Sequence, residues 1–413
     1  MGCGMSETAV RQTRNSRPGL WEIIRRPSLR AVAIMSASST IAGVVGFGAN
    51  ILMSRQLDPD QRGQVAFVLQ LAYLLGPLLM LGVERAALRR DAAETAGAQT
   101  RHLVPMALLL GASLLLLVGD ARALAAAVAV ATAWLVIQRS EALRSHAFRR
   151  YTSCFLGYQA VVGVGLLGLF LTGETRWYMW LIPYLVPVVP VLLWELSRIL
   201  TKPSQTFAAV TRTSMGLLPA TLATMLMLRA ERVMLPLLAS NDQLGLYVAV
   251  ATATEPVYWI ARALADHRAG RTGTDRSVAT LVRRLVKDSV LFTVIAAAVG
   301  VVVWLLIVPV FGQPYAPARD LVLPLVLAAI ALALNRLALA WHLGGPRPSD
   351  VSRIEGLTAG VAITTYAVGI SLGGALGAAW GTFIVYLIGL LISLVLAVFR
   401  QRTENANAPK ENQ

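Results

Sequence analysis

Five charged residues stand in the middle of long apolar stretches of the sequence, where a charge is costly. They are Arg229, Glu231 and Arg232 in stretch 212–238, Glu255 in 244–264, and Arg336 in 319–341. If these stretches cross a lipid bilayer, a charge at the bilayer centre costs roughly 2.5–3.5 kcal/mol. The five side chains must therefore pair with one another or face a hydrated space between helices.

Two interpretations of these charges follow. In the first, Glu231 pairs with an arginine one turn away and Glu255 with one of the arginines, and the pairs only tie helices together. In the second, the charges line a hydrated space, where a surplus of three arginines over two glutamates suits an anionic substrate such as a phosphate group. Arg229, Arg232 and Arg336 would then bind the substrate, and Glu231 or Glu255 would be an ion-coupling or salt-bridging acid.

Polar residues of the first half of the chain are candidates for the wall opposite this cluster. They are Asn50, Gln70 and Tyr73, although polar residues near span ends are commonly structural. Pro236 and Pro256 fall in the two stretches that carry most of the charges. A proline removes a backbone hydrogen bond and kinks its helix. Kinked helices around a polar centre suit alternating access better than a static scaffold.

The composition requires that these stretches lie in a membrane. Of 413 residues, 56% are hydrophobic and 14% charged, whereas about a quarter of a soluble domain is charged. The apolar runs of about 20 residues are long enough to cross a ~30 Å hydrocarbon core. The net charge of +15 is dispersed between these runs, which indicates membrane topology and argues against nucleic-acid binding.

Hydropathy predicts an all-α polytopic membrane protein with twelve transmembrane helices. The predicted spans are 31–53, 63–83, 103–119, 121–138, 154–172, 177–197, 212–238, 244–264, 289–309, 319–341, 354–374 and 378–399. Lysines and arginines number 29 on the side of both termini and 5 on the other. By the positive-inside rule, this asymmetry predicts a multi-pass protein of the cytoplasmic (inner) membrane with both termini in the cytoplasm.

A faint internal repeat divides the chain in two. DQRG at 60–63 enters the second predicted span, and DQLG at 242–245 enters the eighth. The offset equals six spans, so two six-helix halves would share one orientation, as in transporters with parallel repeats. We expect an N-terminal lobe over 31–200 and a C-terminal lobe over 201–400. Cytoplasmic segments at 1–30 and 401–413 would flank them.

Several familiar sites are disfavoured by spacing. His102, His146, His267 and His342 show no metal-ligand spacing, so no metal site is predicted. GVGLLG at 163–168 matches a dinucleotide fingerprint, but it lies inside a predicted span with no preceding strand, and no cofactor is expected. The short outer connections hold few acids and no nucleophile–base pair, which disfavours an enzyme.

Several segments together resemble one family. The stretch from LDP at 57–59 to Gly82 is similar to the first hairpin of polysaccharide flippases of the O-antigen type. These form a branch of the multidrug/oligosaccharidyl-lipid/polysaccharide exporter superfamily. RAER at 229–232 resembles that family's seventh helix, with Glu231 where an Asp is usual, and GAAWG at 377–381 resembles a closing segment. The likeness is diffuse but covers nearly all twelve predicted spans.

The resemblance implies two six-helix lobes around a central cavity and a flippase that exports an undecaprenyl-pyrophosphate-linked oligosaccharide by alternating access. Arg229, Arg232 and Arg336 would face the pyrophosphate and sugar acids. Implied partners are the lipid-linked glycan, the phospholipid bilayer, and a polysaccharide polymerase or glycosyltransferases. Two alternatives stay open: a small-molecule or drug exporter of the same superfamily, and a non-transporting membrane scaffold of a glycan-assembly complex.

Overall fold

The computed structural model describes residues 27–80, 124–144, 148–186, 218–269, 277–343 and 349–407. Within these ranges the chain forms helices and short connections and no β-strand, so the predicted all-α class is confirmed. The first half contributes α2 (Pro27–Gln56), α3 (Pro59–Met80), α6 (Leu124–Arg144), α7 (Phe148–Leu171), the 3₁₀ segment η3 (Trp177–Leu181) and α8 (Ile182–Leu185).

The second half contributes the longer helices. They are α11 (Leu218–Leu238), α12 (Asn241–Ala269), α13 (Val278–Leu306), the π segment η5 (Ile307–Phe311), the 3₁₀ segment η6 (Gln313–Leu321), α14 (Val322–Leu343) and α15 (Ser349–Asn407). Helix α15 is broken by non-helical backbone at Gly373 and Gly374. Gly374 has φ = 54°, a conformation that glycine adopts at little cost. The break separates the predicted spans 354–374 and 378–399.

The predicted spans that fall within the described residues coincide with helices, but the number of spans is not established. Span 103–119 lies outside the described residues, and so does the second half of span 177–197. Five described helical stretches are long and apolar enough to cross a membrane: Pro59–Met80, Thr152–Leu171, Val278–Phe311, Gln313–Leu343 and Ser349–Thr403. Several helices are longer than the apolar spans predicted for them, because a helix can continue through the polar residues at its end. Helix α15 thus extends to Asn407, into the segment predicted as a tail.

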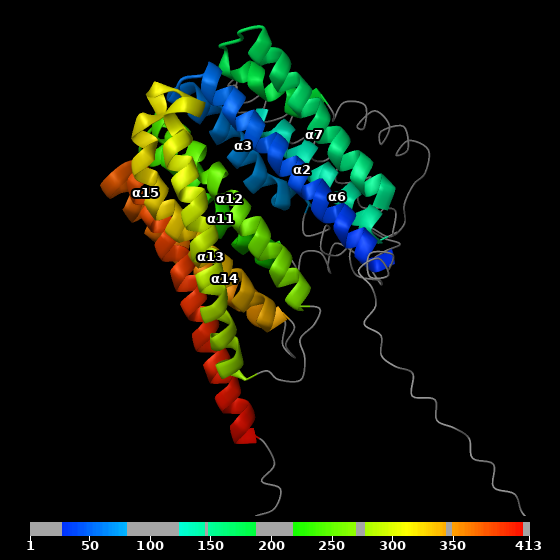
Figure 1. Cartoon of the computed structure of the whole chain (residues 1–413), viewed down its shortest axis with the longest axis vertical. Helices are drawn as coiled ribbons and strands as arrows, with labels where there is room; N and C mark the ends of the chain where they lie inside the picture. The colour runs from blue at the N-terminus through cyan, green and yellow to red at the C-terminus, as the bar shows by residue number, and fades with distance from the viewer. Residues whose placement is uncertain are drawn as a thin grey trace, which may run out of the picture.

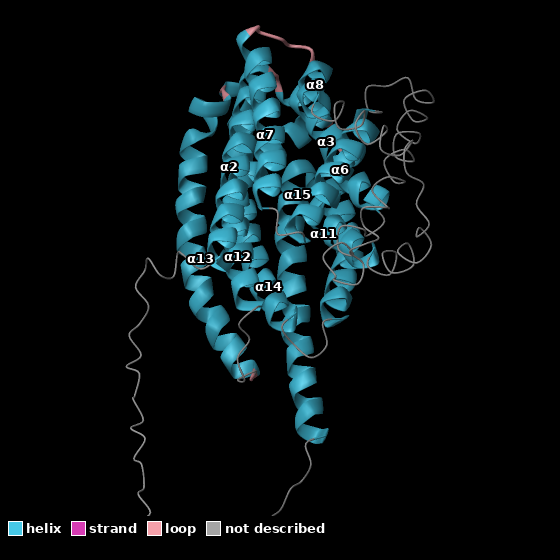
Figure 2. Cartoon of the chain, turned by 90° about the vertical axis from the view of Figure 1, so that its right-hand side faces the viewer, coloured by secondary structure: helices cyan, strands magenta, loops and turns pink. Residues whose placement is uncertain are grey.

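The helices form two bundles that share one interface. In the first bundle α2 packs on α7 and α3 on α6, and in the second α14 and α15 pack on each other, α11 packs on α15, and α12 and α13 pack on α14. Helix α3 of the first bundle lies against α11 and α12 of the second, and α2 also contacts α12. Figure 1 shows the two bundles together at one end and diverging toward the other. In Figure 2 most helices run along the same direction.

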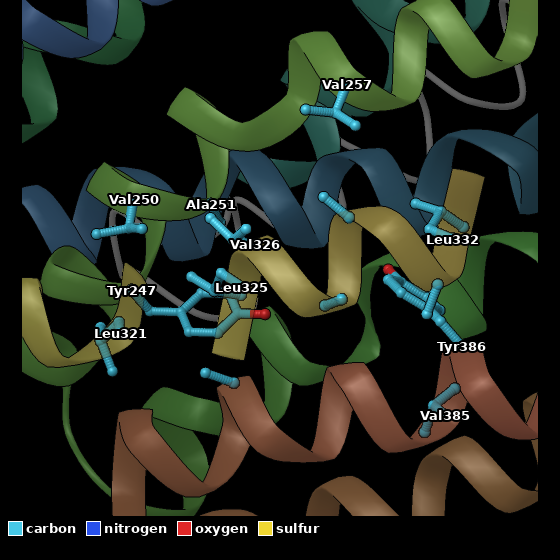
Figure 3. Packing of buried hydrophobic residues seen from close by; sticks show 14 of the residues in the cluster. Tyr247, Val250, Ala251, Val257, Leu321, Leu325, Val326, Leu332, Val385 and Tyr386 are labelled. Carbon is cyan, nitrogen blue, oxygen red and sulfur yellow. The ribbon is translucent and has the colours of Figure 1, made fainter. Parts of the chain in front are cut away.

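The interior and the outside of the second bundle are both apolar. Tyr247, Leu325 and Tyr386 pack among aliphatic side chains in its core (Figure 3). On its outer surface, α13 exposes Val290, Val294 and further large apolar side chains. In water such a surface would be unfavourable, whereas hydrocarbon is as apolar as these side chains. The arrangement therefore fits a protein surrounded by lipid.

The two repeat motifs meet where the bundles come together. We call this the outer end, after the predicted topology; it holds the connections 57–58, 172–176 and 239–240. A methyl group added at Gly63 of α3 would overlap the carbonyl oxygen of Asn241, and one added at Gly245 of α12 would overlap that of Pro59. Each glycine thus lies on the first residue of the other helix. The two glycines hold the same position in the two repeat motifs, so the two contacts are equivalent.

The outer connections are also held locally. Asp58 precedes α3 and its Oδ1 accepts a hydrogen bond from the Gln61 amide at 2.8 Å, as an N-cap residue does. In the connection 172–176, Arg176 donates two hydrogen bonds to Glu174, each of 2.8 Å. These bonds hold the pKa of Glu174 down at about 2. The carboxylate is therefore charged at any physiological pH.

Candidate functional site

Four of the five predicted charges form one cluster between α11 and α12. Arg232 lies 3.3 Å from the Oε1 of Glu231 and, through Nη1, 3.3 Å from the Oε1 of Glu255. Arg229 approaches the same Glu255 oxygen at 3.6 Å. Residues three apart share a face of a helix, which is why Arg229 and Arg232 both point from α11 toward α12. Glu255 is thus shared by two guanidinium groups.

The cluster has a buried part and an accessible part. The side chains of Glu231 and Arg232 are 1% and 9% exposed, so this pair lies inside the second bundle. Those of Arg229 and Glu255 are 27% and 24% exposed. The Tyr247 hydroxyl lies 3.4 Å from the Glu231 carboxylate and 3.0 Å from the hydroxyl of Thr382. The buried pair is therefore held by its own bundle, whereas the side chains of Arg229 and Glu255 are partly exposed.

Arg229 extends the cluster across the interface to the first bundle. Its Nη1 donates a hydrogen bond to the Oε1 of Gln70 at 3.1 Å. Its guanidinium carbon lies 5.5 Å from the ring centroid of Tyr73, within the range of a cation–π interaction. Gln70 and Tyr73 were both candidates for the opposite wall. Asn50, the third candidate, lies elsewhere, beside Arg62 at the outer end.

Arg336 does not contact this cluster. Its Nη1 donates to the Oε1 of Glu355 at 3.1 Å, and its guanidinium carbon lies 5.8 Å from the ring centroid of Tyr258. Glu355 is a partner that the sequence did not indicate. It stands at the polar end of predicted span 354–374, where a charged side chain is expected to be solvated. With Glu355 included, three arginines face three glutamates. The expected cationic surplus is thus absent among the described residues of this region.

Two further ion pairs of the described residues lie outside the cluster. Arg268 of α12 holds Asp288 of α13, and Arg400 holds Asp350 across the two arms of α15. Both link helices within the second bundle. In the described part of the chain no cluster of three or more histidine, cysteine, aspartate or glutamate side chains could hold a metal ion.

The fold is shared with solved transporters. The chain superposes on an inward-facing multidrug resistance MATE family transporter of the MOP superfamily with a TM-score of 0.64 and 14% identity, covering 92% of this chain and 99% of that one. An outward-facing MATE transporter gives a TM-score of 0.56 at 13% identity, with 92% and 97% covered. The lipid II flippase MurJ, in an inward closed conformation, gives 0.55 at 9% identity, with 91% and 93% covered.

At these identities the likeness shows the fold: the chain has the helical architecture of MOP-superfamily membrane transporters. No protein-family model matches the sequence, and no curated protein matches it significantly.

Proposed function

We propose that this chain is a flippase that moves an undecaprenyl-pyrophosphate-linked oligosaccharide across the cytoplasmic membrane by alternating access. The observation that carries the proposal is the place of Arg229. Its partly exposed guanidinium stands at the interface of the two bundles and contacts Glu255 on one side and Gln70 on the other. A guanidinium in that position offers donors in the geometry that a phosphate group accepts.

The shared carboxylate suggests how substrate and ion would be exchanged. Glu255 balances Arg229 and Arg232 when no substrate is bound. A pyrophosphate that reaches Arg229 competes with Glu255 for the same donors. Substrate and Glu255 would then compete for the same guanidinium groups, and Glu255 would be the acid that also binds the coupling ion.

The contacts between the bundles fit a state that loads from the inner side. The bundles approach most closely at the outer end, where Gly63 and Gly245 lie on the opposite helix. They diverge toward the other end (Figure 1). The similarity to an inward-facing MATE transporter points the same way. In this state Arg229 would be reached from the cytoplasmic side, where the lipid-linked glycan is assembled.

We place both termini in the cytoplasm and assign residues 31–200 and 201–400 to the two lobes. Arg232 and Arg336 would act with Arg229 toward the pyrophosphate and sugar acids, and Glu231 would hold Arg232 in place as a salt-bridging acid. A polysaccharide polymerase or glycosyltransferases would supply and consume the glycan. No enzymatic step is proposed.

One observation favours a small-molecule or drug exporter as the second candidate. The described charges of the region balance evenly, three arginines against three glutamates. A neutral site that exposes the ring of Tyr73 beside a shared carboxylate could also hold an organic cation. Two of the three solved structures described above are MATE transporters.

The deciding experiment compares Arg229→Ala with Arg353→Ala in a strain that lacks the chromosomal gene. Arg353 is a matched control because its side chain is 68% exposed, at the inner end of α15. We expect Arg229→Ala to insert normally and to lower the amount of exported glycan at least tenfold, with Arg353→Ala unchanged. Wild-type glycan export by Arg229→Ala would refute the assignment. Loss of drug efflux instead of glycan export would favour the second candidate.

A further inference from the structure

A second buried guanidinium, Arg62, has a different environment from the central arginines. It lies in the first turn of α3 and is 4% exposed. Its Nη2 donates to the Oδ1 of Asn50 at 2.6 Å. Its Nε and Nη1 have no hydrogen-bond partner among the described residues, and it belongs to none of their ion pairs. Arg232 and Arg336, by contrast, each face a glutamate.

The other unsatisfied polar atoms nearby can also donate hydrogen bonds. The amide nitrogen of Asn50 and the hydroxyl of Ser54 are buried and make no well-formed hydrogen bond in the described part of the chain, although the Ser54 hydroxyl faces that of Tyr315. They stand four residues apart on α2, on one face of that helix. Since the Asn50 oxygen already accepts from Arg62, its amide group has only donors left. Arg62, Asn50 and Ser54 therefore present a positive charge and four atoms that can act as donors.

Such a group is unstable without an acceptor. A buried ion that lacks a counter-charge is strongly destabilising, and each buried donor without an acceptor adds to that cost. A water molecule could accept some of these hydrogen bonds, but it would leave the charge uncompensated. A small anion with no hydrogens accepts from every donor and neutralises the guanidinium as well. We propose that Arg62, Asn50 and Ser54 form a binding site for a small inorganic anion of the chloride class.

The site is covered by the second bundle. Tyr315 of η6 is buried, and its hydroxyl donates to the carbonyl oxygen of Leu57 at the end of α2, at 3.3 Å. Gly63, the residue after Arg62, lies on Asn241 at the closest approach of the bundles. The anion would be enclosed when the outer ends are together and released when they part. A ligand that binds one state stabilises that state, so the anion would favour closure of the outer end.

Anion binding itself does not depend on which substrate is carried; only its link to closure rests on the alternating access proposed above. The test is therefore made without substrate. The thermal unfolding midpoint of the purified full chain in detergent is measured in sodium chloride and in sodium gluconate of equal ionic strength. We expect a saturable rise of the midpoint with chloride.

Two substitutions test the site, and one serves as a control. Arg62→Gln removes the charge, and the chloride response should be lost. Asn50→Asp places a carboxylate beside the guanidinium, so the protein should be stabilised in gluconate and become insensitive to chloride. Arg353→Gln, at an exposed inner position, should keep the full response. If Arg62→Gln does not fold, Asn50→Asp decides alone.

Either of two results would overturn the proposal. One is a wild-type midpoint that is the same in chloride and gluconate, which would mean that water alone satisfies the donors. The other is an equal chloride response in the wild type and in Asn50→Asp, which would place the effect elsewhere. A wild-type protein that shows the chloride response but exports no glycan would count against the proposed transport function and leave this site intact.

Discussion

At the scale of single residues, Glu255 is the group on which the central cluster depends. One of its oxygens lies within 3.6 Å of both Arg229 and Arg232. Glu231 is fully buried and is held by Arg232 within the second bundle. Glu255 is therefore better placed than Glu231 to change partners when a ligand arrives. The sequence left the choice between these two acids open.

Replacing Glu255 with Gln should uncouple transport from the driving ion. The amide keeps the size and some hydrogen bonding of the side chain, but it cannot bind a proton or balance two cations. We expect slower transport that no longer responds to external pH or sodium. Glycan or drug flux into inverted vesicles over a range of pH and sodium concentrations measures this. Unchanged pH and sodium dependence would show that Glu255 is structural.

Arg232 and Arg229 should behave differently when shortened, because their burial differs. Arg232→Ala leaves the buried Glu231 without its partner, and breaking a buried ion pair costs about 3–5 kcal/mol. We expect a clearly lower unfolding midpoint in detergent. Arg229→Ala removes a partly exposed side chain and should lower the midpoint much less. Equal midpoints for the two variants would contradict the division of the cluster into a buried and an accessible part.

The sequence located the central charges but not all of their partners. Arg229, Glu231, Arg232 and Glu255 could be grouped because their cost in a bilayer forces them together. Glu355 and Arg62 were missed because both stand at the ends of apolar runs, where charges are usually solvated. Helix α3 begins at Pro59, four residues before the apolar run begins. Arg62 was therefore expected in a connection and is instead buried inside the protein.

At the scale of elements, the crossing of α3 and α12 sets the distance between the bundles at the outer end. Gly63 and Gly245 occupy equivalent positions in the two halves, and each touches the backbone of the other helix. A side chain at either position would collide with backbone, which cannot move aside as a flexible side chain can. The sequence showed the repeat but not this contact, since a repeat offset carries no information on how two halves dock.

Gly63→Ala should therefore hold the outer ends apart. The change can be followed by electron–electron distance measurements between spin labels at Thr175 and Ala239, two exposed positions in the outer connections of the two bundles. Cys3 and Cys154 are first replaced by alanine. We expect the distance distribution to shift to longer values. Gly46→Ala is the matched control, because a methyl group there meets no atom within 4 Å. An unshifted distribution in Gly63→Ala would refute the steric argument.

At the scale of the whole molecule, the all-α fold class could be predicted from hydropathy. What could not be predicted is how the bundles sit together, because the contacts of α3 with α11 and α12 join residues that are far apart in sequence. The balance of three arginines and three glutamates also becomes apparent only when helices distant in the sequence are brought together. A list of charges in one stretch cannot show which are neutralised from another.

The topology of the whole chain can be tested directly. The excess of lysines and arginines predicts that both termini lie in the cytoplasm. A green fluorescent protein fused after residue 413 should fluoresce, since that reporter folds in the cytoplasm. Alkaline phosphatase fused after Gly173, in an outer connection, should be active. The reverse pattern would show that both termini lie outside the cytoplasm. Arg229 would then be reached from the outer side of the membrane.

The mutual contact of Gly63 and Gly245 with each other's helices has a consequence for the evolutionary origin of the chain. If the two halves arose by duplication of one gene, their common ancestor was a half-length chain that assembled as a symmetric pair. A single mutation in that ancestor altered both sides of the seam at once. After fusion each copy could vary separately, and Arg62 in one half corresponds to Leu244 in the other. A symmetric homodimer would thus have become a single chain in which equivalent positions hold a charged residue in one half and an apolar residue in the other.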